Sequence, residues 1–165
     1  MNARRLTFSS LLALALLAIP QVALAATTYT DTLVGREFFA TSTVGGFAGT
    51  ATGDLPGSWF AVVEHTPLSP GATITGGQFG LSTTIGGRPA TVTGTFSGGT
   101  VTQTGGLTGC QNQTYAVDGT LENVGPGGGT GTGTFTATLT HLRTFFFGRC
   151  VTYGARVAGT VTLTF

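Results

Sequence analysis

The stretch TGTGTFTATLT, residues 130–140, decides the fold class. Every second residue in it is Thr, and the residues between become apolar at Phe135, Ala137 and Leu139. A β-strand directs successive side chains to opposite faces of its sheet, because its side-chain period is two residues. The alternation therefore predicts a half-buried strand with one hydroxylated face and one apolar face.

The end of the chain repeats the pattern over residues 150–165, CVTYGARVAGTVTLTF. Val157, Val161 and Leu163 fall on one face and Thr160 on the other. No segment after residue 27 keeps an apolar period of 3.6 residues, because Gly or Pro interrupts each candidate helix. The chain is therefore predicted to be all-β.

Turn residues divide the chain into strand-like segments. Residues 55–58 (LPGS) match a type II turn with Pro and Gly at its centre, and residues 98–99 (GG) separate two further runs. The predicted strands are residues 27–44, 47–54, 58–66, 72–85, 90–97, 100–104, 113–122, 130–144 and 150–165. Consecutive short strands joined by tight turns indicate an antiparallel meander of about eight strands.

An open sheet of this size exposes two edges, which natural proteins protect with charged residues, especially Lys. The sequence contains no Lys. Closure removes both edges, so we predict a single domain over residues 26–165, folded as a small antiparallel β-barrel. A two-sheet β-sandwich is the alternative.

Composition excludes several classes of protein. The 165 residues include 28 Gly and 34 Thr, only 8% are charged, and the net charge is +1. Nucleic-acid binding needs a basic surface that this chain lacks. A hydrophobic fraction of 41% is too high for a disordered chain.

Residues 1–25 have the features of a secretory signal peptide. Arg4 and Arg5 precede an apolar run at residues 11–19, and residues 23–25 (ALA) provide a cleavage site. Cleavage would leave five Arg against six acidic residues and no membrane-spanning segment. The protein is therefore expected to be secreted or to lie in the cell envelope.

Cys110 and Cys150 are the two cysteines of the chain. An even pair in an exported protein favours a disulfide. Closing this loop would stabilise the fold by about 4 kcal/mol, because it restricts the unfolded chain.

The few titratable residues limit any chemistry to a short set of candidates. His65 shares a strand face with Trp59, and Glu64 shares the opposite face with Phe60. Both faces are largely apolar, so we expect this strand to be covered on both sides. Glu64 or His65 would then point into the lumen and could act as an acid or base, since burial raises a carboxyl pKa. Alternatively, one of them ends the strand in solvent before Pro67.

His141 and Arg143 share a face with Leu139 and complete the candidate catalytic residues. The two histidines have no metal-ligand spacing, and no G-x-S-x-G or phosphate-loop context is present. We therefore expect neither a metal nor another cofactor.

Adjacent aromatic residues expose both faces of a strand. Phe145 and Phe147 lie in such a run, and with Trp59 and Phe60 they are the candidate residues for binding an apolar small molecule or a cell-surface partner. Packing at the barrel rim would explain them equally well.

Three segments, 49–54 (GTATGD), 76–81 (GGQFGL) and 129–135 (GTGTGTF), resemble the allene oxide cyclase and dirigent group of small secreted β-barrels. The resemblance covers residues 47–165. It implies an apolar lumen, used in that group either for cyclisation or for guiding the coupling of bound radicals. No catalytic acid of the group can be matched to a residue here.

The function we predict is non-enzymatic binding of an apolar small ligand or a surface partner. A cofactor-independent isomerase or cyclase of the allene oxide cyclase type is the alternative. A structural envelope protein is a further possibility, as is an ice-binding protein with ranks of Thr.

Overall fold

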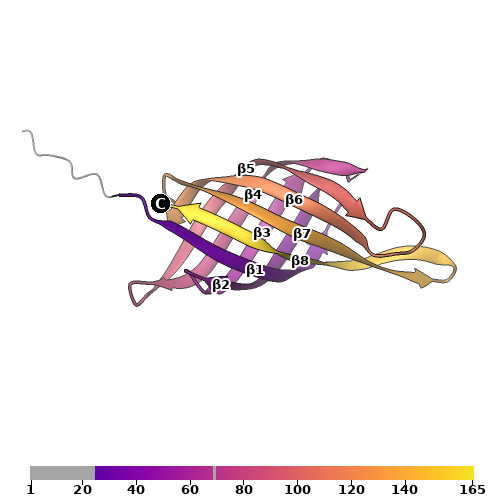
Figure 1. Ribbon diagram of the computed structural model, residues 1–165, viewed down its shortest axis with the longest axis horizontal. Helices are drawn as coiled ribbons and strands as arrows, with labels where there is room; N and C mark the ends of the chain where they lie inside the picture. The colour runs from indigo at the N-terminus through magenta and orange to yellow at the C-terminus, as the bar shows by residue number, and fades with distance from the viewer. Residues whose placement is uncertain (1–24, 69) are drawn as a thin grey trace, which may run out of the picture.

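The computed structural model describes residues 25–68 and 70–165, and the described chain forms a closed barrel of eight antiparallel strands (Figure 1). The strands are β1 (Thr28–Ala40), β2 (Val44–Gly53), β3 (Gly57–His65), β4 (Gly71–Ile85), β5 (Arg88–Gly105), β6 (Gln113–Pro126), β7 (Gly131–Phe146) and β8 (Arg149–Thr164). Each strand pairs with the next, and β8 pairs with β1. The all-β barrel prediction is confirmed over the sandwich. The predicted signal peptide lies outside the described residues, apart from Ala25.

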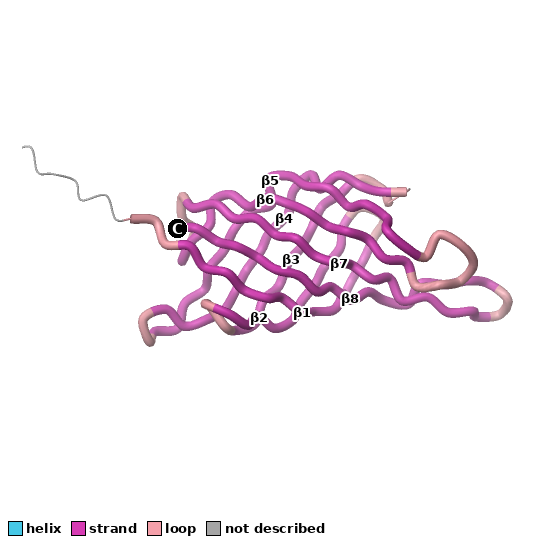
Figure 2. Tube along the Cα trace, in the orientation of Figure 1, coloured by secondary structure: helices cyan, strands magenta, loops and turns pink. Residues whose placement is uncertain are grey.

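The up-and-down order gives the barrel two different ends (Figure 2). The β1–β2, β3–β4, β5–β6 and β7–β8 connections lie at one end, which we call the mouth. The other three turns lie at the opposite end with the start of β1 and the end of β8, and we call this the closed end. The β7–β8 hairpin projects beyond the mouth (Figure 1).

Successive side chains of each strand point alternately into the lumen and out to solvent, as the sequence pattern predicts. Leu139 in β7 is buried, whereas Thr138 beside it is exposed. Val161 and Leu163 in β8 are fully buried. Tyr153 has the same parity but is 65% exposed, because it lies in the projecting hairpin and not in the barrel wall.

The prediction that residues 98–99 separate two strands is wrong, because β5 runs unbroken from Arg88 to Gly105. Its pairing with β6 shifts between Phe96 and Gly98, which marks a β-bulge. The bulge adds one residue, so Phe96 and Val101 are both buried although their separation is odd. A pair of glycines that suggested a turn therefore bends one long strand.

The predicted type II turn at residues 55–58 is also wrong. Such a turn needs a positive φ at Gly57, but Gly57 is extended and already pairs with Ala51 in the sheet. Gly57 instead allows β3 and β4 to lie close together, because a Cβ there would collide with the carbonyl oxygen of Ser82.

The first strand ends at Ala40, earlier than residue 44. The Thr41 hydroxyl accepts hydrogen bonds from the backbone amides of Thr43 (3.3 Å) and Val44 (3.0 Å). This local bonding replaces the strand ladder and turns the chain into β2.

The closed end is filled by side chains. Leu55 folds inward from the β2–β3 turn and is only 2% exposed, and its amide donates a 2.8 Å hydrogen bond to Oδ1 of Asp31. Leu81, Val92 and Leu163 are fully buried in this half of the barrel. The lumen is therefore sealed at this end.

The mouth end is held by the Cys110–Cys150 disulfide, which confirms that prediction. It joins the β5–β6 loop to the start of β8. Arg143 adds to the link, because its backbone amide donates to Oδ1 of Asn112 (2.9 Å) and its guanidinium donates to the Gly109 carbonyl (3.5 Å).

Candidate functional site

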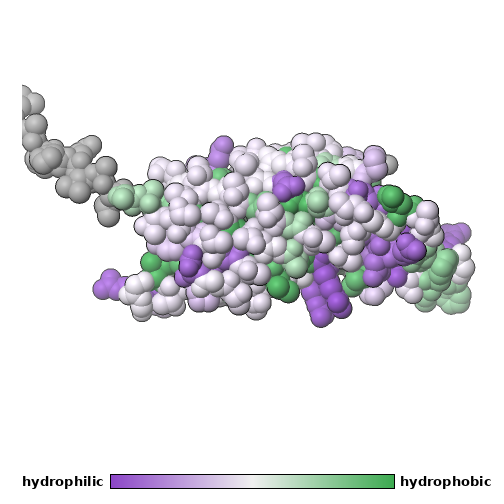
Figure 3. Space-filling model, in the orientation of Figure 1, coloured by the Kyte–Doolittle hydropathy of each residue, from purple (hydrophilic) through white to green (hydrophobic). Residues whose placement is uncertain are grey.

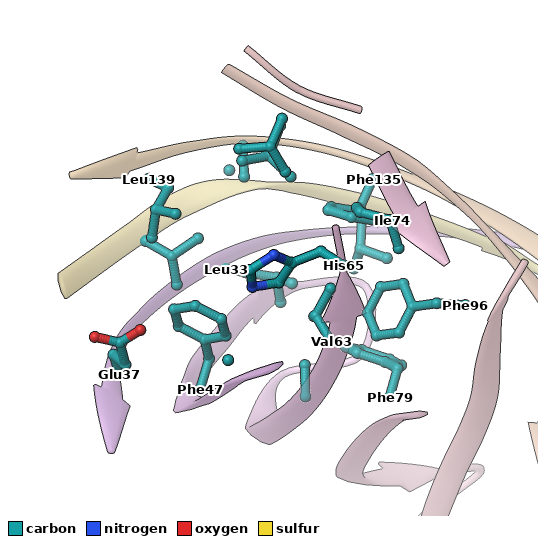
Figure 4. Close-up of a pocket in the computed structure, with 18 of the residues that line it drawn as sticks. Leu33, Glu37, Phe47, Val63, His65, Ile74, Phe79, Phe96, Phe135 and Leu139 are labelled. Carbon is teal, nitrogen blue, oxygen red and sulfur yellow. The ribbon is translucent and has the colours of Figure 1, made fainter. Parts of the chain in front are cut away.

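An apolar cavity of about 130 Å³ occupies the mouth half of the lumen (Figure 4). All eight strands contribute to its wall, because the alternation of each strand turns every second side chain inward. The apolar wall includes Leu33, Phe47, Val63, Ile74, Phe79, Phe96, Phe135 and Leu139. The cavity is thus built by the same pattern that determined the fold.

Aromatic rings shape the wall. Phe96 and Phe135 meet edge to face, with ring centroids 5.3 Å apart. Trp59 is 5% exposed, and its indole Nε1 donates a 3.1 Å hydrogen bond to the Thr50 carbonyl. A Cβ on Gly35 would collide with the indole, so this glycine makes room for it. Trp59 is therefore fixed in place as part of the cavity wall.

Three titratable side chains, Glu37, His65 and His141, line the cavity toward the mouth. In Figure 4 the His65 ring lies among the apolar side chains and Glu37 lies at the edge of the group. They come from β1, β3 and β7, strands that are distant in sequence. The otherwise apolar lumen therefore has a polar margin at its mouth.

Burial perturbs two of these groups. It raises the pKa of Glu37, and the nearby His65 partly opposes that rise. Burial lowers the pKa of His141, and the charges of His65 and Arg143 lower it further. The mouth therefore favours the uncharged forms of Glu37 and His141.

Hydrogen bonding orients His65. Its Nδ1 lies 2.7 Å from the Thr66 carbonyl oxygen, which can only accept, so Nδ1 carries the proton. In the neutral ring, Nε2 is then an acceptor. His141 packs against Tyr115 with ring centroids 5.1 Å apart, and the Tyr115 hydroxyl donates to Oε1 of Gln113 at 3.3 Å.

Of the four candidate catalytic residues, the structure brings together His65 and His141. Glu64 is exposed on the outer face of β3, opposite to His65. Arg143 does not line the cavity, and it instead binds the β5–β6 loop. Sequence reasoning missed Glu37, which shares its parity with Leu33 and so faces inward with it.

Of the four candidate ligand-binding residues, only Trp59 lines the cavity. Phe60 is 44% exposed and its ring lies over Gly80 on the outer wall, so β3 is not covered on both sides as expected. Phe145 and Phe147 lie outside the lumen in the projecting hairpin.

Within residues 25–68 and 70–165, no three His, Cys, Asp or Glu side chains lie close enough together to hold a metal ion. The described part of the chain also has no helix that is long and apolar enough to cross a membrane. No protein family, curated protein or solved structure matches the chain.

Proposed function

We propose that this protein binds a small apolar molecule in its lumen without transforming it. The observation that carries the proposal is the cavity of about 130 Å³, walled by apolar side chains from all eight strands. An apolar cavity of about 150 Å³ in another protein binds benzene, so the size suits a single ring or a short branched chain. The disulfide is consistent with a protein outside the cytoplasm, and we place it among secreted or envelope proteins.

The polar margin of the cavity indicates which polar group the ligand would carry. His65 uses Nδ1 to bond the Thr66 carbonyl and so presents Nε2 to a ligand, and Glu37 with its raised pKa can accept or donate a hydrogen bond. A ring that carries one hydroxyl would place its apolar part against Phe96 and Phe135 and its hydroxyl toward these two groups. The proposed ligand class is therefore a small hydroxylated ring.

Trp59 provides the test, because it is the only Trp in the chain and it lines the cavity. Titration with p-cresol or toluene should change its fluorescence in a saturable way. The variant Ala61→Phe fills the lumen from β3 and should abolish the change. Ala48→Phe adds the same atoms to the exposed face of β2 and should leave binding intact.

Native mass spectrometry of protein purified from its source gives independent support if a small molecule is retained. The proposal fails if neither probe binds saturably and no molecule is retained. It also fails if Ala61→Phe, folded by circular dichroism, binds as the wild type does.

The second candidate is a cofactor-independent isomerase or cyclase, the activity implied by the resemblance to the allene oxide cyclase group. The convergence of Glu37, His65 and His141 on one cavity favours it. Prolonged incubation with the retained molecule would then give a product of unchanged mass and altered chromatographic retention. Glu37→Gln would stop this conversion but preserve binding, whereas recovery of the molecule unchanged would exclude the activity.

A further inference from the structure

The β7–β8 hairpin carries large apolar side chains into solvent beyond the mouth. Phe145, Phe146, Phe147 and Tyr153 are 69%, 61%, 91% and 65% exposed, and Leu107 in the adjacent β5–β6 loop is 76% exposed. These five residues form what we call the aromatic tip. Figure 3 shows hydrophobic atoms gathered at this end of the molecule, beside hydrophilic ones. Scattered apolar residues are normal on a protein surface, but several large exposed ones gathered at one end of the molecule indicate a binding site.

The aromatic tip is built into the fold. Pairing between β7 and β8 continues to Phe146 and Arg149, next to the turn. The Cys110–Cys150 disulfide fastens the loop that bears Leu107 against the same hairpin. The apolar side chains are therefore displayed on a braced support.

The turn itself is strained by one of these aromatic residues. Phe147 and Gly148 have φ of 47° and 73°, which matches a two-residue hairpin turn with positive φ at both positions. Asn, Asp or Gly suit the first position, whereas a bulky residue there is strained. Since Phe147 is also 91% exposed, it gains little from packing in return. Strain of this kind is typical of functional positions.

The charges of the barrel are distributed unevenly along its axis. Arg143 and Arg149 belong to the hairpin, and Arg36 and Arg156 are cross-strand neighbours on the outer wall toward the same end. Residues 106–112 and 143–153, which form the aromatic tip and its support, contain no Asp or Glu. Glu64 on the outer face of β3 and Glu37 inside the lumen are the acidic side chains toward the mouth, and Asp118 is exposed on β6 between the two ends. At the closed end the acidic residues are Asp31, Asp54 and Glu122, against Arg88.

We propose that the aromatic tip binds the surface of an anionic lipid bilayer and seats the barrel mouth against it. Phe and Tyr side chains insert at the boundary between headgroups and acyl chains, and arginines beside them attract anionic headgroups. A second copy of the chain fits less well, because a contact between two aromatic tips would place two surfaces that carry Arg143 and Arg149 and no acidic residue against each other. The docking does not depend on whether the lumen holds a ligand.

The test is flotation of the protein with lipid vesicles. Protein purified from an extracytoplasmic fraction, with its N terminus checked by intact mass, is mixed with vesicles of phosphatidylcholine and phosphatidylglycerol, or of phosphatidylcholine alone. We expect binding to the anionic vesicles, which weakens as salt increases. Replacing Phe145, Phe146 and Phe147 together by Ser should lower the partition coefficient by at least about tenfold. Arg149→Gln should lower it about fivefold, since one basic residue near the surface contributes about 1 kcal/mol.

Phe60→Ser is the matched control, because it removes an exposed aromatic ring from the barrel wall and should leave binding unchanged. The variant Phe147→Trp provides a second measurement, which does not depend on the triple variant. Brominated phospholipid should quench the fluorescence of the indole introduced at this position. Trp59 inside the lumen should be unaffected.

The proposal is overturned if the protein binds neither kind of vesicle or binds both equally. It is also overturned if the triple Ser variant is folded and binds as the wild type does. Light scattering decides the main alternative. A dimer that the triple Ser variant converts to a monomer, without vesicle binding by the wild type, would assign the aromatic tip to contact with a second copy.

Discussion

Removing the disulfide with the double substitution Cys110→Ser and Cys150→Ser tests how the barrel is stabilised. The two cysteines are 40 residues apart in sequence. Loop-closure entropy for a loop of this length gives about 4 kcal/mol of stability, because the disulfide restricts the unfolded chain. In the folded barrel β6, β7 and β8 remain paired in a closed sheet, so we expect the native structure to change little.

The expected loss in melting temperature follows from the size of the barrel. For a domain of about 140 residues, 1 kcal/mol corresponds to about 3 °C, so the double variant should melt about 12 °C below the wild type. Urea unfolding followed by Trp59 fluorescence measures the free energy directly, since this residue lies inside the lumen and reports loss of the barrel.

Reduced wild-type protein is the matched control and should unfold like the double Ser variant. A loss below about 1 kcal/mol in both would refute the reasoning from loop entropy. A loss well above about 6 kcal/mol would show that the disulfide also holds the folded sheet together.

Three further predictions test the core and the strand contacts. Burial raises the pKa of Asp31, with Asp54 adding to it, and Oδ2 of Asp31 has no hydrogen-bond partner among the described residues. Because this folded-state pKa is raised, the stabilisation is present below the ordinary carboxyl pKa and is lost as pH rises through the folded value. Asp31→Asn should therefore flatten the pH profile of urea unfolding and stabilise the barrel at neutral pH, and an unchanged profile would contradict this. Leu81→Ala removes a fully buried side chain and should cost about 3 kcal/mol by the same measurement, whereas a cost below about 1 kcal/mol would indicate that the closed end is not well packed. Gly159→Ala would press a Cβ against the β7 backbone at Thr136 and should cost about 2 kcal/mol, whereas Gly154→Ala meets no atom within 4 Å and should be nearly neutral; equal melting temperatures would refute the contact.

The barrel could be predicted from the sequence because strand parity is a local property. Residues 130–140 alternate strictly, and the structure keeps that alternation between exterior and lumen. The glycine pair at residues 98–99 predicts a turn but forms a bulge, because a bulge and a turn have the same local composition. What distinguishes them is pairing of Gly98 and Gly99 with Thr120 and Gly119 in β6, a contact between distant segments.

The candidate site was partly predictable for the same reason. Parity with Trp59 places His65 in the lumen, but apolar residues on both faces of β3 concealed which face was inside. Glu37 stands between Arg36 and Phe38, where no apolar alternation remains to mark it as inward. That His65 and Glu37 line one cavity depends on how the sheet closes, which no single strand encodes.

Threonine content indicates the fold and not the activity. The Thr side chains of β7 and β8 face outward on a closed and therefore curved wall, and their register pairs Thr134 with Thr162 across the two strands. An ice-facing surface requires a flat array, so these hydroxyls are better explained as the solvent face of the barrel.

The two ends of the barrel are built differently. Leu55 and Asp31 seal the closed end through a backbone hydrogen bond and burial, so any molecule that reaches the cavity must pass the mouth. The polar margin of the cavity and the strained Phe147 both lie at that end. Substitutions at the closed end should therefore act on the free energy of unfolding. Substitutions in the polar margin and the aromatic tip should act on ligand and membrane binding at nearly constant stability, because these side chains are not part of the packed core. The Cys110–Cys150 disulfide is the mouth-end feature whose removal should lower stability.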